Sequence, residues 1–302
     1  MRRGRQPVLL LALLCLLSGA CASPTGTGSD EALVLDPATA IALSVLSDSI
    51  YLIDPATGRR AEVVGGLPHF QAGFATWSPD HRRLAYAQDG IYVVDFSANE
   101  QQLIEHGRGL SMPSWSPQGE QLVFGDGGSM WRTTIGSGAP ARLRIPSTLA
   151  PLGMHWSNKG LIAFEGLARD CRRSSHCSTT DRSEIWVLDP NGGMLEQITR
   201  VGHAENPKWS PDGSRILFIR RGDSTMTRRE LWVVNADGSG SHPLVSGQNV
   251  VAADWSPDGA RIAMVTASNE THTLQLRIAD ARGSKSQAVG GSFRGTEATV
   301  DW

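Results

Sequence analysis

Short apolar runs recur along the chain, each bounded by residues that favour turns. Leu84-Ala85-Tyr86, Leu122-Val123-Phe124 and Ile216-Leu217-Phe218 are three of these runs. Runs of this length between turn signals are typical of buried β-strands. Each run ends nine residues after a tryptophan that opens a Trp-Ser phrase. The pattern therefore predicts strands at fixed places within a repeated unit.

All nine tryptophans fall on two positions of this repeat. Six occupy the position of the Trp-Ser phrase, the last one without a following serine: Trp77, Trp115, Trp156, Trp209, Trp255 and Trp302. The other three lie in a second apolar phrase: Trp131, Trp186 and Trp232. The average spacing of the first set is about 45 residues, which is typical of propeller blades. Such strict periodicity favours packing between blades over ligand stacking as the role of the tryptophans.

Each unit contains the signals of four strands. The phrase Trp-Ser-Pro-Asp-Gly predicts a tight turn, because proline presets φ, aspartate accepts local hydrogen bonds and glycine adopts positive φ. A second strand follows at phrases such as Ile185-Trp186-Val187, and a second turn follows at Asp189-Pro190-Asn191-Gly192. The last strand leads into the next tryptophan. Four short strands per unit form one propeller blade.

Strands from the two ends of the chain are expected to form one blade together. The last strand, at residues 300–302, has no further strands after it, whereas residues 31–76 contain three strands before the first Trp-Ser phrase. We expect an all-β, six-bladed propeller with four antiparallel strands per blade. Its ring is closed by one C-terminal strand that joins three N-terminal strands, and it spans residues 36–302. Five or seven blades would leave strands unpaired.

Composition and charge limit the functional classes. A chain of 302 residues with 40% apolar residues can form a single all-β domain. The net charge of −2 gives no reason to expect nucleic-acid binding, which is normally accompanied by strong basicity. No catalytic residue and no cofactor are predicted, and we expect a monomer.

The pattern of the N-terminal residues predicts a targeting segment. Arg2, Arg3 and Arg5 precede an apolar core and small residues, which predicts a signal peptide at residues 1–20. Cys21 follows small residues in the manner of a bacterial lipobox, and residues 21–35 form a polar tether. We expect lipidation of Cys21 and attachment to the outer face of a membrane or in the periplasm. Ordinary cleavage would instead release a soluble secreted protein.

Two further cysteines lie close together in the sequence. In an oxidising compartment, Cys171 and Cys177 are expected to form a disulfide. The alternative is a zinc site that includes His176, for which the sequence supplies no evident fourth ligand.

The repeated phrases resemble those of a known family. Trp255-Ser256-Pro257-Asp258-Gly259 and the phrase Leu-Trp-Val-Val-Asn-Ala-Asp-Gly at 231–238 are similar to the WD-repeat-like propeller repeats of the TolB family. The resemblance implies a six-bladed propeller over residues 31–302, without the α/β domain that precedes the propeller in TolB. Peptidase activity is not implied, because the G-x-S-x-G motif of prolyl-oligopeptidase-like enzymes is missing.

Candidate binding residues lie on two variable segments. Residues 165–183 form an insertion, and the neighbouring unit adds a second basic stretch. Their candidate residues are Arg169, Arg172, Arg173, Arg220, Arg221, Arg228 and Arg229. Arginine forks bind carboxylates and phosphates, so these residues predict a docking patch for an envelope protein or an anionic envelope polymer. The alternative is a set of solvated loop arginines.

Three histidines suggest a second kind of site. His69, His106 and His203 lie in predicted connections between blades, where polyuronate lyases with TolB-like propellers hold a metal. Their different distances from the following tryptophan favour unrelated surface histidines. The sequence thus favours an exported, membrane-tethered binding or scaffolding module, and a metal-assisted lyase is the alternative.

Overall fold

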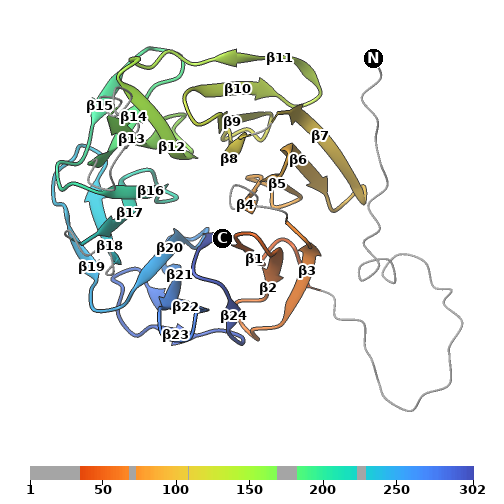
Figure 1. Cartoon of the computed structure of the whole chain (residues 1–302), viewed down its shortest axis with the longest axis vertical. Coiled ribbons are helices and arrows are strands. Elements are labelled where there is room, and N and C mark those ends of the chain that lie inside the picture. Colours follow the sequence, from red (N-terminus) through yellow and green to blue (C-terminus); the bar gives the residue numbers. More distant parts are fainter. Residues whose placement is uncertain (1–34, 68–72, 108, 169–181, 223–228) are drawn as a thin grey trace, which may run out of the picture.

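The computed structural model describes residues 35–67, 73–107, 109–168, 182–222 and 229–302. Six antiparallel sheets stand around a central axis, and the described residues contain no helix (Figure 1). The prediction of an all-β, six-bladed propeller is confirmed.

In blades two to six the strands follow in chain order, from the innermost strand outward. The first blade contains β1 (Ile41–Val45), β2 (Ser49–Ile53) and β3 (Arg60–Val64). The second contains β4 (Gly73–Trp77), β5 (Arg83–Ala87), β6 (Gly90–Asp95) and β7 (Glu100–His106). The third contains β8 (Ser111–Trp115), β9 (Gln121–Gly125), β10 (Met130–Thr134) and β11 (Ser137–Arg142).

The other three blades repeat this order. The fourth contains β12 (Leu149–Trp156), β13 (Ile162–Ala168), β14 (Ser183–Leu188) and β15 (Leu195–Gln197). The fifth contains β16 (Ala204–Trp209), β17 (Arg215–Arg221), β18 (Arg229–Asn235) and β19 (His242–Val245). The sixth contains β20 (Val250–Trp255), β21 (Arg261–Ser268), β22 (Thr273–Asp280), β23 (Gln287–Ala288) and β24 (Phe293–Arg294).

The ring closes as the sequence predicts. The last strand, β25 (Ala298–Asp301), is the innermost strand of the first blade and pairs antiparallel with β1. Ala42 lies opposite Asp301, and Val45 lies opposite Ala298. In Figure 1 the C-terminus accordingly lies beside β1, next to the central axis.

Local hydrogen bonds explain the turn after each repeat tryptophan. The Oγ of Ser210 donates to Asp212 over 2.6 Å and accepts the backbone N–H of Arg215 over 3.0 Å. Gly213 closes this turn with a φ of 63°. In the second blade His81 takes the place of the glycine and adopts a φ of 53°. The turn is thus formed by the residue types that the repeat preserves.

The repeat tryptophans pack between blades. Trp115 belongs to one buried cluster with Ala85 and Ile91 of the preceding blade. Arginines reinforce this packing: Arg83 lies over Trp115 at 4.7 Å, and Arg215 lies over Trp255 at 4.6 Å. Each of these arginines comes six residues after the tryptophan of its own blade and covers that of the next.

Antiparallel strand order gives the ring two different faces. The turn face carries the Trp-Ser turns and the turns between the third and fourth strands of each blade. The loop face carries the connections between the second and third strands and those between blades. No helix of sufficient length and hydrophobicity to cross a membrane occurs in the described ranges.

Candidate functional site

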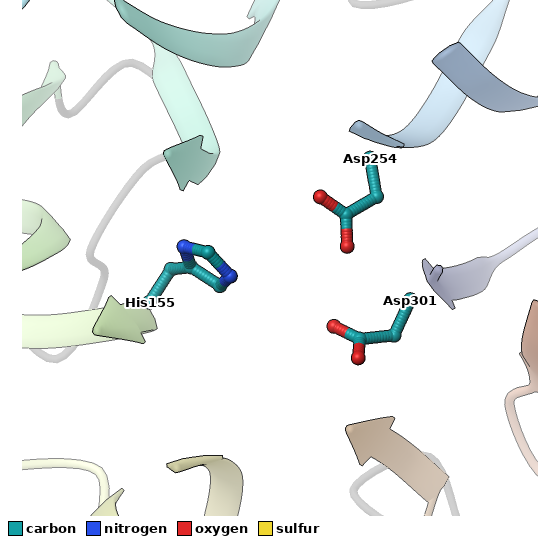
Figure 2. Close-up of side chains that lie close together, drawn as sticks. All are labelled: His155, Asp254 and Asp301. Atoms are coloured by element: carbon teal, nitrogen blue, oxygen red, sulfur yellow. The ribbon is translucent and has the colours of Figure 1, made fainter. Parts of the chain in front are cut away.

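A ring of polar side chains lies at the centre of the propeller. The residue before each repeat tryptophan is polar, and each lies on or next to the end of an innermost strand. These six residues, here called the central ring, are Thr76, Ser114, His155, Lys208, Asp254 and Asp301. Successive side chains of a strand point to opposite faces of its sheet, so this residue points away from the preceding blade, against which the tryptophan packs. Figure 2 shows His155, Asp254 and Asp301 directed toward one another from separate strands.

A lysine joins the two carboxylates of the central ring. The Nζ atom of Lys208 lies 3.0 Å from Oδ2 of Asp254 and 2.5 Å from Oδ1 of Asp301. Burial alone lowers the pKa of a lysine, but here the two carboxylates outweigh it and raise the pKa of Lys208. The ammonium is therefore a fixed internal cation.

The two aspartates differ in their pKa. Burial raises the pKa of Asp254 to about 7, against the opposing effect of Lys208. Burial also acts on Asp301, but Lys208 and hydrogen bonds outweigh it and lower the pKa of that carboxyl. Asp301 is thus the ionised partner of Lys208, whereas Asp254 exchanges its proton near neutral pH.

The central ring also connects neighbouring blades through backbone groups. Oδ2 of Asp301 accepts the N–H of Trp77 over 2.7 Å. Nδ1 of His155 accepts the N–H of Trp209 over 3.0 Å, and Ser114 accepts that of Trp156 over 2.9 Å. An acceptor at this position therefore provides a hydrogen-bond partner for a buried N–H of the next blade. This bond stabilises the fold whether or not the ring has a chemical function.

The central ring contains the one group of described residues arranged for metal binding. Ligand atoms of His155, Asp254 and Asp301 lie within 4.8 Å of one another. However, the Lys208 ammonium already bridges the two carboxylates. Because Nδ1 of His155 accepts a hydrogen bond, the proton of the neutral imidazole lies on Nε2, which then has no lone pair for a metal. These residues fit an internal ammonium better than a metal ion.

Two cavities flank the central ring. The cavity on the turn face has a volume of about 260 Å³ and is lined by all six repeat tryptophans together with His155, Asp254 and Asp301. The cavity on the loop face has a volume of about 60 Å³, and its lining is mainly apolar but includes Lys208. The ring therefore presents carboxylates on one side and its ammonium on the other.

Three tryptophans at the larger cavity have unsatisfied indole groups. Trp77 and Trp115 donate their Nε1–H groups to backbone carbonyls at 3.0 and 3.1 Å. The buried Nε1–H groups of Trp156, Trp209 and Trp255 have no hydrogen-bond partner among the described residues. Buried donors normally have one.

A second charged cluster lies on the loop face. The Nε atom of Arg221 is 2.7 Å from Glu205, and Arg229 holds Glu297 through two contacts of 2.7 and 2.8 Å. Burial, together with the neighbouring Glu205, raises the pKa of Glu165 to about 8. Glu165 is therefore largely protonated at neutral pH, which leaves two arginines facing two carboxylates.

Two of the predicted binding arginines, Arg221 and Arg229, form the ion pairs of this cluster. Arg220 and Arg221 end β17 and Arg229 begins β18, so they lie at strand ends rather than within loops. Arg220 stacks on Trp232 at 4.9 Å. Arg169, Arg172, Arg173 and Arg228 lie outside the described residues, and so do Cys21, Cys171 and Cys177. Lipidation, the disulfide and the docking patch remain predictions.

None of the histidines in the sequence hypothesis is a member of the central ring. His106 is exposed at the end of the outermost strand β7, and His203 directly precedes the innermost strand β16. Neither belongs to the group formed by His155, Asp254 and Asp301. His69 lies outside the described residues.

The central ring was not anticipated from the sequence. The signal is nevertheless present: in all six units a polar residue directly precedes the tryptophan. The tryptophan position determines the packing between blades, and the position directly before it determines the chemistry of the axis.

Comparisons with known proteins agree with the fold. No family model matches the chain, and no curated protein matches it. Among solved structures, TolB from Acinetobacter baumannii has a TM-score of 0.69 at 17% identity, over 87% of this chain and 66% of that one. This chain thus spans slightly less than two thirds of that TolB.

Two further structures show how widely the fold is used. A chain of a nidogen–laminin complex has a TM-score of 0.63 at 12% identity, over 87% of this chain and 97% of that one. An oligogalacturonate lyase in complex with manganese has a TM-score of 0.57 at 16% identity, over 83% and 74%. At these identities the likeness concerns the fold alone. The described residues form a six-bladed β-propeller whose fold is similar to that of TolB.

Proposed function

We propose that this chain is an exported, membrane-tethered propeller that acts as a binding or scaffolding module in the cell envelope. The observation that carries the proposal is the internal compensation of the central ring. Lys208 neutralises Asp301 and contacts Asp254, and His155 is used to accept a backbone N–H. Metal-assisted chemistry at the axis would need these same groups to be free, so the arrangement favours binding over catalysis.

The partner is proposed to bind on the loop face. Variable connections on a rigid scaffold commonly carry binding residues, and the ends of β13 and β14 that flank the predicted insertion lie at the loop face. Arg221 and Arg229 are already paired with Glu205 and Glu297, so they would have to exchange partners to hold an anion. Arg220 instead stacks on Trp232 and donates to the carbonyl of Val201. Arg220, Arg172 and Arg173 are therefore the proposed contacts of an envelope protein or anionic polymer.

Solved propellers of the same fold support a binding role. One belongs to a TolB, and another belongs to a nidogen–laminin complex, which is an assembly of proteins. The polar segment after Cys21 suits a tether between an anchored cysteine and the propeller. These points support the proposal without identifying the partner.

The test is a crosslinking pull-down from native membranes with the full-length protein. Its intact mass first determines whether Cys21 carries lipid. The combined charge reversal R172E/R173E/R220E is expected to remove the captured partner. The control R82E/R282E reverses two exposed arginines on the turn face and is expected to retain it. If both variants capture the same partners, the loop-face proposal is wrong.

The alternative function is a metal-assisted lyase acting on an acidic polysaccharide. Its support is the fold of the manganese-bound oligogalacturonate lyase. Stoichiometric metal in the purified protein, lost in H106N or H203N together with cleavage of polyuronate, would favour this alternative over the binding module.

A further inference from the structure

A cavity between the fifth and sixth blades, on the turn face, is lined by basic side chains. Its volume is about 310 Å³. Arg215 and His242 of the fifth blade line it together with Arg282 of the sixth. Pro243 and Leu244 belong to its apolar wall, and no aspartate or glutamate of the described residues lines it. The lining therefore carries a net positive charge.

The strand register explains why polar side chains of the fifth blade converge here. Arg215 lies opposite Asn235, and Val233 lies opposite His242. Residues that lie opposite one another on paired strands point to the same face of a sheet, and so do residues two positions apart. Val233 packs in one buried cluster with Trp255 of the sixth blade. Arg215, Asn235 and His242 therefore all point toward the sixth blade.

A turn of the sixth blade brings Arg282 to the same cavity. This turn joins β22 to β23, and its Gly283 adopts a φ of 73°. A Cβ atom at this glycine would lie 2.7 Å from the carbonyl oxygen of Leu244, so the turn packs closely against β19. The carboxylate of Asp280 accepts the hydroxyl of Ser284 over 2.6 Å and backbone N–H groups of the turn. Asp280 is thus used to form the turn that carries Arg282.

The donors of these basic groups are available to a ligand. Arg215 stacks on the indole of the next blade, but its guanidinium has no hydrogen-bond acceptor among the described residues. The equivalent Arg83 of the second blade donates to the carbonyl of Gly119 over 2.7 Å. Nδ1 of His242 donates to the carbonyl of Gly240 over 2.7 Å, because a carbonyl only accepts. Nε2 of this histidine therefore remains for a ligand.

We propose that this cavity binds the phosphoryl group of a small phosphate monoester. Guanidinium groups bind phosphate through charge-assisted hydrogen bonds. Two of them, with an imidazole that donates through Nε2 when protonated, suit the three terminal oxygens of a phosphoryl group better than the two oxygens of a carboxylate. The organic part of the ligand contacts Pro243 and Leu244. The cavity lies on the opposite face from the proposed partner site, so neither proposal depends on the other.

The test uses glycerol phosphate as the probe, with glycerate as its carboxylate counterpart and glycerol as its uncharged counterpart. Isothermal titration calorimetry of the full propeller is expected to detect binding of glycerol phosphate. Glycerate is expected to bind at least tenfold more weakly, and glycerol is expected not to bind. If glycerol phosphate does not bind, or if glycerate binds equally well, the proposal is wrong.

The indole N–H signals in ¹H–¹⁵N spectra locate the bound probe. Because Arg215 stacks on Trp255 at 4.6 Å, glycerol phosphate is expected to shift the signal of Trp255. Trp131 belongs to the third blade, and its signal is expected to stay unchanged. A shift of Trp131 without a shift of Trp255 would place the probe elsewhere and would also contradict the proposal.

Three variants of exposed residues make the test specific to the cavity. R282Q is expected to weaken binding of glycerol phosphate at least tenfold, and H242N is expected to weaken it at least threefold. R82Q removes an exposed arginine from the turn face of the second blade and is expected to bind as wild type does. Equal affinities of R282Q and R82Q would overturn the proposal.

Discussion

The backbone N–H of Trp209 donates to Nδ1 of His155 over 3.0 Å, across the boundary between the fourth and fifth blades. The bond requires an unprotonated Nδ1. Burial, together with the nearby Lys208, lowers the pKa of His155 to about 3. Protonation of this imidazole therefore opposes folding.

A pH dependence with a definite sign follows from His155. Its pKa in the folded protein, about 3, lies below the ordinary value of 6.5, so its contribution to stability is present above pH 6.5 and is lost as pH falls toward 3. The variant H155N keeps an acceptor but does not titrate. Relative to wild type it is expected to gain about 1.4 kcal/mol per pH unit below pH 6. Urea unfolding at several pH values measures this, with exposed His106→Asn as control. Parallel pH profiles for H155N and wild type would contradict it.

Removal of the internal cation is expected to destabilise the ring. K208M leaves Asp254 and Asp301 buried without their partner, which costs about 3–5 kcal/mol. The double variant K208M/D254N removes one of the two carboxylates and is expected to recover part of this loss. Chemical unfolding of the three proteins at pH 7 provides the comparison. If K208M lowers the free energy of unfolding by less than about 1 kcal/mol, the Lys208 ammonium does not stabilise the contacts at the axis.

Glu165 gives the opposite pH dependence on the loop face. Its pKa is raised from 4.5 to about 8, so its contribution to stability is present below pH 4.5 and is lost as pH rises toward 8. E165Q does not titrate at this position. The stability of E165Q relative to wild type is therefore expected to increase between pH 4.5 and 8. The exposed substitution E196Q on β15 is the control, and it should follow the wild-type profile. A relative stability that stays constant over this range would show that Glu165 is ionised in the folded protein.

The arginines stacked on tryptophans are expected to stabilise contacts between blades. Arg215 covers Trp255 at 4.6 Å, and an interaction of this kind contributes about 1 kcal/mol. R215Q should lose this amount, and R215K should recover only part of it, because lysine lacks the planar group. Thermal unfolding measures the difference, with exposed Arg282→Gln as control. Equal stability of R215Q and R282Q would show that the stacking of Arg215 on Trp255 does not stabilise the packing between blades.

The fold could be predicted from the sequence because the repeat encodes it locally. Residues such as Ser210, Asp212 and Gly213 form their turn through hydrogen bonds within five positions. The central ring depends instead on contacts between residues far apart in the chain. Lys208 and Asp301 are 93 positions apart and meet only because six blades close into a circle. A pattern within one unit carries no information about which polar residue will face which across the axis.

The position of β25 bears on the order in which the molecule acquires its structure. Ala42 and Asp301 are neighbours in one sheet, so the first blade lacks its axial strand until residues 298–301 have been synthesised. Contacts of such large sequence separation form late, because a long loop must first be closed. Blades two to six contain all their strands within local stretches, and they can assemble earlier. We therefore expect that the charged axis, with Asp301 as one of its members, is completed in the last step of folding.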